Sequence, residues 1–264
     1  MTTSSLSLST HAAQRDLAEI RRSAEEALNI GFVSVDPRQV QRYIDPPSNT
    51  PYGLEYAFHL LGNIQGKTVL DLGCGKGENL VPLAKRGGNV IGLDISPDLI
   101  RLAEEHVKSA GVSPDLAIGS AYQTGLPDES VDIVLCVALI HHLDIPRVRA
   151  EMLRILKTDG FVVLAEPVRF SNSYARLRNL LPAKANISEF EHPLTRPEFE
   201  SMVSGFVPED LRYFRLPFVP LIGKLVRNMH RLVYALSAWL IGEFPTLRHF
   251  ATSVVVRLRK RGTV

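Results

Sequence analysis

The stretch from Thr68 to Glu78, which reads TVLDLGCGKGE, constrains the fold of this 264-residue chain more than any other. It begins with β-favouring residues and continues into three alternating glycines, Gly73, Gly75 and Gly77. A short apolar run next to glycines is typical of a buried parallel strand. Glycine permits positive φ and lets a ligand approach the main chain closely. With a helix expected to begin near Glu78, the stretch predicts a strand, a turn and a helix N-terminus that cradle a nucleotide-type ligand.

The spacing of these glycines distinguishes between families of nucleotide-binding loops. The dinucleotide fingerprint is G-x-G-x-x-G, and a phosphate-binding loop carries a Lys-Ser or Lys-Thr pair after its last glycine. Here the pattern is G-x-G-x-G with Asp71 before it, which fits neither. The sequence DLGCGKG closely resembles the first motif of the class I methyltransferases, which use S-adenosylmethionine. In that family the loop wraps the amino-acid end of the cofactor, which carries no phosphate.

Predicted strands and helices alternate from Thr68 onward, which is the pattern of a parallel sheet covered on both faces. The resemblance is best over about residues 50–170, and it implies a Rossmann-like α/β fold with a mostly parallel seven-stranded sheet. We predict strands at about 67–72, 89–94, 115–118, 131–137, 161–166, 211–218 and 251–258. We predict helices at about 11–30, 40–44, 52–61, 78–84, 96–109, 144–156, 173–181 and 195–204, with two more within 219–247.

The length suits one α/β domain with elaborations, because a chain of this size buries a full core. We expect residues 1–50 to form an N-terminal helical segment with a disordered start. Residues 51–264 are then the methyltransferase domain itself. Two stretches, at about 168–195 and 219–247, interrupt the alternation of strands and helices. We interpret them as cap or lid insertions, the second of them helical and near the C-terminus.

Charge is distributed unevenly along the chain. From residue 211 onward ten basic residues face a single acid, Glu243, so the last 54 residues carry a net +9. Since the whole chain carries +2, the first 210 residues carry −7. The basic part is also apolar over 216–226 and 232–240. A basic region suits an anionic substrate or peripheral contact with an anionic membrane, and a solvated basic edge with no partner is an equally open interpretation. The apolar segments suit a hydrophobic acceptor pocket or a membrane surface, and burial on the sheet or across a homodimer interface is at least as open.

The sequence also limits the compartment and the class of partner. Its two cysteines, Cys74 and Cys136, give neither a disulfide framework nor a zinc-ligand spacing, so we expect a cytoplasmic protein. The polar first ten residues do not resemble a secretory signal, and the apolar run 232–242 is too short to span a bilayer. No N-P-P-Y-type motif follows the fourth strand, and no recognition module is readable, so we expect no nucleic-acid partner.

The positions that match the family motifs are predicted to form the cofactor site. Asp94 ends the second strand, where a carboxylate accepts hydrogen bonds from both hydroxyls of a ribose. The resemblance places Ile95 beside the adenine and Val137 beside the cofactor sulfur. Ser120 departs from the family pattern, which often has an acidic residue there to reach the adenine amine. The full predicted set is Asp71, Gly73, Cys74, Gly75, Asp94, Ile95, Ser120, Ala121 and Val137.

The acceptor side is marked by two adjacent histidines after the fourth strand, His141 and His142. Imidazole titrates near neutrality, so either is a candidate general base, and the alternative is that the pair only orders the loop. Neighbouring residues rarely share one metal and no third ligand is evident, so no metal is predicted. Weaker candidates for positioning an acceptor are Glu166, Glu191 and His192. Candidates for closing the pocket, or for packing at the sheet edge, are Tyr43, Tyr52 and Tyr56.

The predicted activity is transfer of a methyl group from S-adenosylmethionine to a small, mostly apolar organic acceptor, with oxygen favoured over nitrogen or carbon. The cofactor already carries a reactive methyl group, so the protein has mainly to align the acceptor and exclude water. An alternative is a protein that binds S-adenosylmethionine without transferring the methyl group. A nicotinamide oxidoreductase is a third class, which the glycine spacing disfavours.

Overall fold

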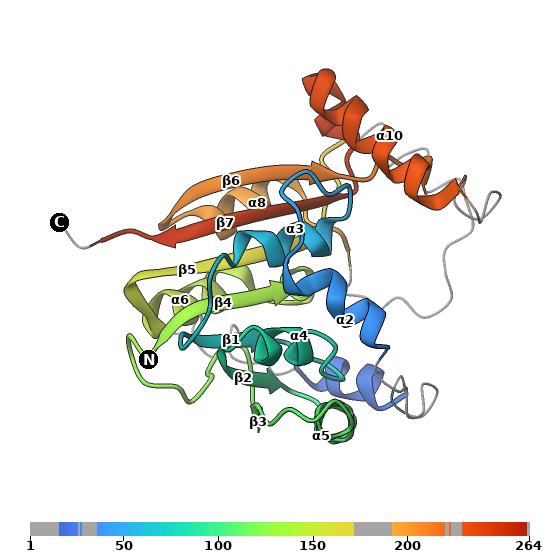
Figure 1. Ribbon diagram of the computed structural model, residues 1–264. Coiled ribbons are helices and arrows are strands. Elements are labelled where there is room, and N and C mark those ends of the chain that lie inside the picture. Colours follow the sequence, from blue (N-terminus) through green and yellow to red (C-terminus); the bar gives the residue numbers. More distant parts are fainter. Residues whose placement is uncertain are drawn as a thin grey trace, which may run out of the picture.

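The computed structural model describes residues 16–25, 27, 36–171, 192–219, 222 and 229–262. Within them a seven-stranded sheet has the order β3-β2-β1-β4-β5-β7-β6 (Figure 1). All neighbouring pairs are parallel except the two that β7 makes with β5 and β6, so the predicted mostly parallel sheet is confirmed. The strands are β1 (Thr68–Leu72), β2 (Asn89–Asp94), β3 (Asp115–Ile118), β4 (Val131–Val137), β5 (Leu156–Pro167), β6 (Phe206–Phe214) and β7 (Ser253–Lys260).

Helices cover both faces of this sheet (Figure 1). They are α2 (Pro37–Ile44), α3 (Gly53–Leu60), α4 (Leu80–Lys85), α5 (Pro97–Ser109), α6 (Ile145–Ile155), α8 (Arg196–Val203) and α10 (His230–Glu243), with 3-10 turns η1 (Ile140–His142) and η3 (Pro245–Phe250). Residues 16–25 are also helical. Side chains of α6 and α8 share one apolar cluster with β1 and β4, and side chains of α3, α4 and α5 share the other.

The strands supply both clusters because successive side chains of a strand point to opposite faces of the sheet. Leu70 and Leu72 of β1 lie in the cluster with α6 and α8, whereas Val69 lies in the cluster with α3, α4 and α5. All three side chains are almost fully buried. A strand buried on both faces needs an apolar run rather than an alternating one, which is what the sequence TVL provides.

Helix starts place the turns at the carboxyl edge of the sheet. The side chain of Ser96 accepts a hydrogen bond from the Leu99 amide at 3.3 Å, and Pro97 occupies the first turn, so the predicted N-cap of α5 is confirmed. Asp144 caps α6 in the same way through the Arg147 amide at 3.3 Å. These caps end the loops that follow β2 and β4 at fixed points, and those loops carry the candidate site.

The position of the sixth strand corrects the prediction. We expected it at 211–218, but β6 begins at Phe206 and ends at Phe214. Its first half contains Pro208, and its register shifts between Glu209 and Arg212. An edge strand tolerates a proline and a bulge of this kind, whereas sequence patterns do not indicate them.

Smaller differences concern element ends. The fifth strand begins at Leu156 rather than 161, and the last runs over Ser253–Lys260 rather than 251–258. The helix after the glycine loop begins at Leu80, after a turn that includes Glu78. Within the predicted insertion 219–247, the described part is mainly α10. The helix expected at 173–181 lies outside the described residues.

Candidate active site

The glycine loop after β1 has the conformation that its sequence predicts. Gly73, Gly75 and Gly77 have φ values of 72°, 52° and 85°, in the left-handed region that favours glycine. The amides of Gly73 and Cys74 both donate to the Leu93 carbonyl, at 2.8 and 3.1 Å, which ties the loop to β2. A Cβ on Gly73 would lie 2.8 Å from the Leu139 side chain, whereas one on Gly75 would meet nothing within 4 Å. The loop therefore leaves open space beside Gly75.

Asp71 lies at the end of β1, directly before this loop. Its side chain is fully buried, and neither carboxylate oxygen has a hydrogen-bond partner within the described part of the chain. Burial raises the pKa of Asp71 to about 7. The side-chain amide of Asn79 opposes that rise in pKa, although it forms no hydrogen bond of normal geometry with the Asp71 carboxylate. A buried, unpaired carboxylate is costly, so a cation that reaches it would be bound strongly.

Asp94 ends β2 on the other side of the glycine loop. Its Oδ2 accepts a hydrogen bond from the Gly75 amide and its Oδ1 one from the Ser96 amide, both at 2.9 Å. Burial raises the pKa of Asp94, and these two amides oppose the rise. The carboxylate thus bridges the loop and the start of α5. Each oxygen retains a second lone pair for a ligand hydroxyl.

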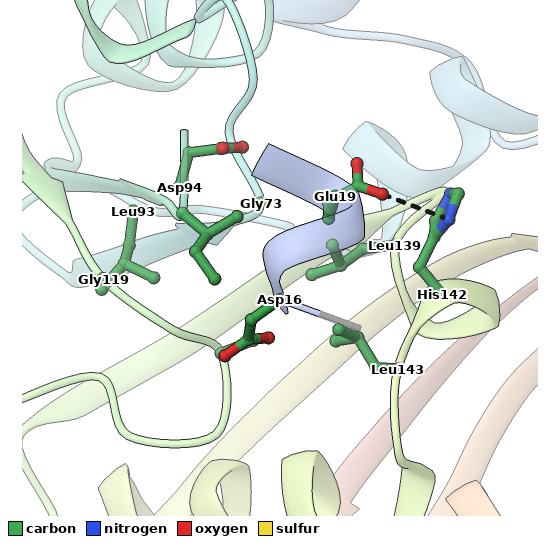
Figure 2. Close-up of a pocket in the computed structure, with 11 residues that line it drawn as sticks. Asp16, Glu19, Gly73, Leu93, Asp94, Gly119, Leu139, His142 and Leu143 are labelled. Atoms are coloured by element: carbon green, nitrogen blue, oxygen red, sulfur yellow. Dashed lines mark ion pairs between the residues drawn. The ribbon is translucent and has the colours of Figure 1, made fainter. Parts of the chain in front are cut away.

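A first cavity opens between this carboxylate and the loops after β3 and β4. Four residues of the predicted cofactor site line it, namely Gly73, Asp94, Ile95 and Ala121. Figure 2 shows that the helix at residues 16–25 crosses it and that Asp16 and Glu19 point towards it. The remaining lining residues are Leu93, Gly119, Leu139, His142 and Leu143.

Ser120 stands at the rim of this first cavity. Its hydroxyl donates to Oδ2 of Asp16 at 3.1 Å and accepts from the Tyr122 amide at 3.3 Å. Burial raises the pKa of the Asp16 carboxyl group. An acidic side chain therefore lies next to Ser120, although the sequence around Ser120 lacks one. Asp16 and Glu19 were missed in the sequence because only the tertiary fold brings their helix to this cavity.

A second cavity lies on the far side of the loop that follows β4. Val137 and Ala138 line it, while the next residue, Leu139, lines the first cavity. Ala138 has a φ of 52°, an uncommon conformation for a residue with a Cβ, and such strain concentrates at functional sites. The other lining residues are Arg42, Tyr43, Tyr52, Gly53, Leu54, Glu55, Ala165, Glu166, Pro167, Phe214, Arg215, Tyr234 and Ser253. The two cavities are thus adjacent at Ala138 and Leu139.

The two histidines differ in their surroundings. His141 is buried, and its Nδ1 lies 2.8 Å from Oε2 of Glu166. The other Glu166 oxygen accepts the amides of Leu139 and Ile140, at 2.7 and 2.8 Å. His142 lines the first cavity, where its Nδ1 lies 3.6 Å from Oε2 of Glu19 (Figure 2). A carboxylate that fixes one imidazole nitrogen is the arrangement that orients a histidine base.

The other predicted residues fall in different places. Cys74 is buried in the loop, and burial raises the pKa of its thiol. Tyr43 and Tyr52 line the second cavity, whereas Tyr56 packs against Phe214 and His59. His192 lies 3.6 Å from Glu198 and lines neither cavity. Glu191 is outside the described residues.

Comparisons with known proteins agree with this arrangement. A family model described as a methyltransferase domain matches residues 70–164, which run from β1 into β5. The ubiquinone biosynthesis O-methyltransferase of Photobacterium profundum is 28% identical over 158 residues, covering 54% of this chain and 67% of that protein. The chain carries a methyltransferase domain. S-adenosylmethionine is the methyl donor of the class I methyltransferases that the glycine motif resembles.

Solved structures share the fold of this methyltransferase domain. A geranyl diphosphate C-methyltransferase from Streptomyces coelicolor A3(2), in complex with Mg²⁺, geranyl diphosphate and S-adenosylhomocysteine, has a TM-score of 0.56 at 17% identity, covering 77% of this chain and 79% of that one. The 4+2-cyclase SpnF has a TM-score of 0.53 at 18% identity, covering 75% and 77%. At such identities the likeness concerns the fold alone.

Proposed function

We propose that the protein transfers a methyl group from S-adenosylmethionine to a small, largely apolar organic acceptor, and that the acceptor atom is an oxygen. The observation that carries this proposal is the adjacency of the two cavities at Ala138 and Leu139. The first is lined by Gly73 of the glycine loop and by Asp94, and the second by apolar and aromatic side chains together with two acidic and two basic ones. Methyl transfer needs a donor and an acceptor held in line, and two cavities lined by consecutive residues are suited to hold them.

The residues at and behind the first cavity suit S-adenosylmethionine, although Asp71, Cys74 and Gly75 do not line the cavity itself. The unpaired, buried carboxylate of Asp71 suits the ammonium group at its amino-acid end, and the open space beside Gly75 admits that end close to the main chain. We assign Gly73, Cys74 and Gly75 to the loop around it and Asp94 to the ribose hydroxyls. The adenine would lie between Ile95 and Ala121, near Ser120. Val137 borders the second cavity, on the side where the methyl group leaves.

When bound, the sulfonium supplies an electrophilic methyl group, so the chain's own residues need only orient the acceptor and manage a proton. Apolar side chains such as Leu54 and Ala165 exclude water from the second cavity. A hydroxyl acceptor loses a proton, for which His141 and His142 are the candidate bases, although neither lines the second cavity and His142 lines the first. Glu166 holds Nδ1 of His141 and thereby leaves Nε2 as the nitrogen that can take a proton.

The test begins with ligand-induced thermal stabilisation. S-adenosylhomocysteine is expected to raise the melting temperature, whereas NAD is expected to leave it unchanged, and the reverse result would refute the proposal. Activity is then measured with S-adenosylmethionine carrying a labelled methyl group and an extract of the source cells. The reaction is acidified before extraction, so that a carboxylate on the product is neutral, and label that then partitions into an organic phase supports an apolar acceptor. Label that stays in the aqueous phase contradicts that part of the proposal.

A second candidate function is binding of S-adenosylmethionine without methyl transfer. The fold of this chain is shared with SpnF, which is a cyclase, so the fold does not by itself establish transfer. The two candidates are separated by turnover. Stabilisation by S-adenosylhomocysteine together with no labelled product from the extract favours this second function.

We also propose a role for the C-terminal insertion. Residues 219–247 would act as a lid over the acceptor, since Tyr234 of α10 lines the second cavity. On the opposite side of α10, Leu232, Leu236 and Trp239 are exposed. We propose that this face rests on an anionic membrane surface, because it lies in the part of the chain with a net charge of +9.

Two further predictions from the sequence remain proposals. They are the domain division at residue 50 and a cytoplasmic location, which the two free cysteines favour. Among the described helices, none is long and apolar enough to cross a bilayer.

A further inference from the structure

The second cavity is lined by two acidic and two basic side chains, and three of these four are already paired. Arg42 contacts Glu55, with its Nε 2.8 Å from Oε1, and Glu55 also accepts from the Thr50 hydroxyl. Glu166 accepts hydrogen bonds from two loop amides and lies against His141. The charges of Arg42, Glu55 and Glu166 are therefore satisfied within the protein. The fourth side chain, Arg215, differs from them.

The side chain of Arg215 has no ion pair and no hydrogen bond within the described part of the chain. Its backbone is nevertheless held firmly, because the Arg215 carbonyl accepts from the Thr252 amide at 2.8 Å and from the Thr252 hydroxyl at 3.1 Å. Its φ of 56° lies in the left-handed region, which is strained for a residue with a Cβ. A strained backbone thus places an uncompensated cation at the wall of the cavity.

Four aromatic side chains line the same cavity as this cation. Tyr43, Tyr52, Phe214 and Tyr234 all line the cavity, and the rings of Tyr52 and Tyr234 lie 5.0 Å apart at an angle of 37°. Rings in such numbers favour a flat, apolar ligand through stacked and edge-to-face contacts. A cation at one end of an aromatic pocket selects a ligand that joins a flat body to an anionic group, and Arg binds carboxylates in a bidentate manner.

The sheet order sets the length of such a ligand. The cofactor side of the cavity is at Val137 of β4, and Arg215 follows β6, which lies three strands away in the order β4-β5-β7-β6. Neighbouring strands are about 4.8 Å apart, so β6 lies roughly 14 Å from β4. Arg215 also lies three residues beyond Arg212, which is the β6 residue in register with Val137, so the two backbone points are farther apart still. The arginine side chain shortens this span but does not close it. The anionic group and the methylated atom must therefore stand farther apart than they do on a single benzoate ring.

We propose that the acceptor is an aromatic acid whose carboxylate is carried on a short spacer beyond the ring, as in a hydroxycinnamate, and that Arg215 binds this carboxylate. This inference rests on the proposed function, since it places the acceptor in the second cavity. Arg215 is then a residue that determines specificity for charge, whereas Ala138 and the loop after β4 determine where the methyl group arrives.

The test measures binding to the protein saturated with S-adenosylhomocysteine, by titration calorimetry. The probes are 3,4-dihydroxycinnamate, its neutral amide, and the shorter 3,4-dihydroxybenzoate. We expect the wild type to bind the cinnamate at least tenfold more tightly than either of the other two. In Arg215→Gln this preference for the acid over the amide should vanish, while affinity for the amide stays within about twofold.

Arg248→Gln is the matched control, because it removes the same charge from an exposed position on η3, outside the proposed lid, that does not line the cavity. It should keep the preference for the acid, which separates direct pairing from general attraction. Equal affinities of acid and amide for the wild type, or an equal loss for both probes in Arg215→Gln, would overturn the inference. Since S-adenosylhomocysteine binding is measured first, a failure of the proposed function is seen separately as the absence of that binding.

Discussion

Oδ2 of Asp94 accepts a hydrogen bond from the main-chain amide of Gly75 at 2.9 Å. The carboxylate at the end of β2 therefore fixes the glycine loop at the end of β1, and Oδ1 holds the start of α5 through Ser96. One side chain thus shapes the loop and also faces the first cavity. The loop and the proposed ribose contact depend on the same group.

Replacing Asp94 should weaken cofactor binding without unfolding the protein. Asp94→Asn keeps the shape but loses the charge and one acceptor oxygen, so the Kd for S-adenosylhomocysteine should rise roughly 10- to 100-fold. Asp94→Ala should abolish thermal stabilisation by this ligand. Asp98→Asn, an exposed change in the first turn of α5, is the control and should bind normally. Unchanged affinity in Asp94→Ala would refute the ribose assignment.

The ionised carboxylate of Asp71 should destabilise the ligand-free protein as the pH rises towards neutrality. Its pKa is about 7 in the folded chain and 3.8 in the reference state, so the folded state holds a proton that the unfolded state releases. Stability contributed by the protonated group is therefore lost as the pH rises from about 4 to 7, and the loss reaches about 4 kcal/mol at most. Asp71→Asn should remove this loss, and the variant should resist urea better than the wild type at pH 8.

The same substitution should prevent ligand binding, because the ammonium group of S-adenosylhomocysteine is proposed to pair with the ionised carboxylate. For the wild type we expect affinity to rise about tenfold per pH unit below pH 7 and to level off above it. Asp115→Asn, at an exposed position where β3 begins, should change neither property. Tight binding by Asp71→Asn, or pH-independent binding by the wild type, would contradict the assigned role.

The parts of this site that the sequence predicted are those set by local chemistry. A strand, three glycines and Ser96 as an N-cap dictate their own conformations, and Asp94 follows from the end of a strand. The hydrogen bond between Asp16 and Ser120 joins residues 104 positions apart, and no local pattern encodes it. The start of β6 was likewise missed because a proline and a bulge hide an edge strand.

The interpretation of the histidine pair needed the structure for a different reason. Adjacent residues look equivalent in a sequence, but the 3-10 turn η1 directs His141 to Glu166 and His142 to the first cavity. Glu166 itself was a candidate for contacting the acceptor, and its oxygens prove to be engaged by the loop. Arg215 was not indicated, since nothing in the sequence shows which arginine lacks a partner.

We expect Glu166 to be a positioning residue, and the first effect of replacing it should be a lower free energy of unfolding. Glu166→Ala leaves two buried amides and His141 without their acceptor, so the free energy of unfolding should fall by about 3 kcal/mol or more. Urea titration measures this, and Glu200→Ala on the exposed side of α8 is the control. If His141 is the base, Glu166→Gln should also shift the pH profile of kcat. A stable Glu166→Gln variant with an unchanged profile would leave His142 as the base.

The proposed contact between α10 and a membrane can be followed by tryptophan fluorescence. Trp239 is the only tryptophan of the chain, and it is 56% exposed on the same face as Leu232 and Leu236, with Phe244 beside it at a ring distance of 6.3 Å. Vesicles of phosphatidylglycerol and phosphatidylcholine should shift its emission to the blue and protect it from iodide, and high salt should weaken both effects because the attraction is partly electrostatic. Leu236→Glu should abolish the shift, whereas Val207→Glu, an equally exposed change on β6, should not. If the emission spectrum instead changes with protein concentration and is unaffected by vesicles, the result indicates that this face binds a second copy of the chain.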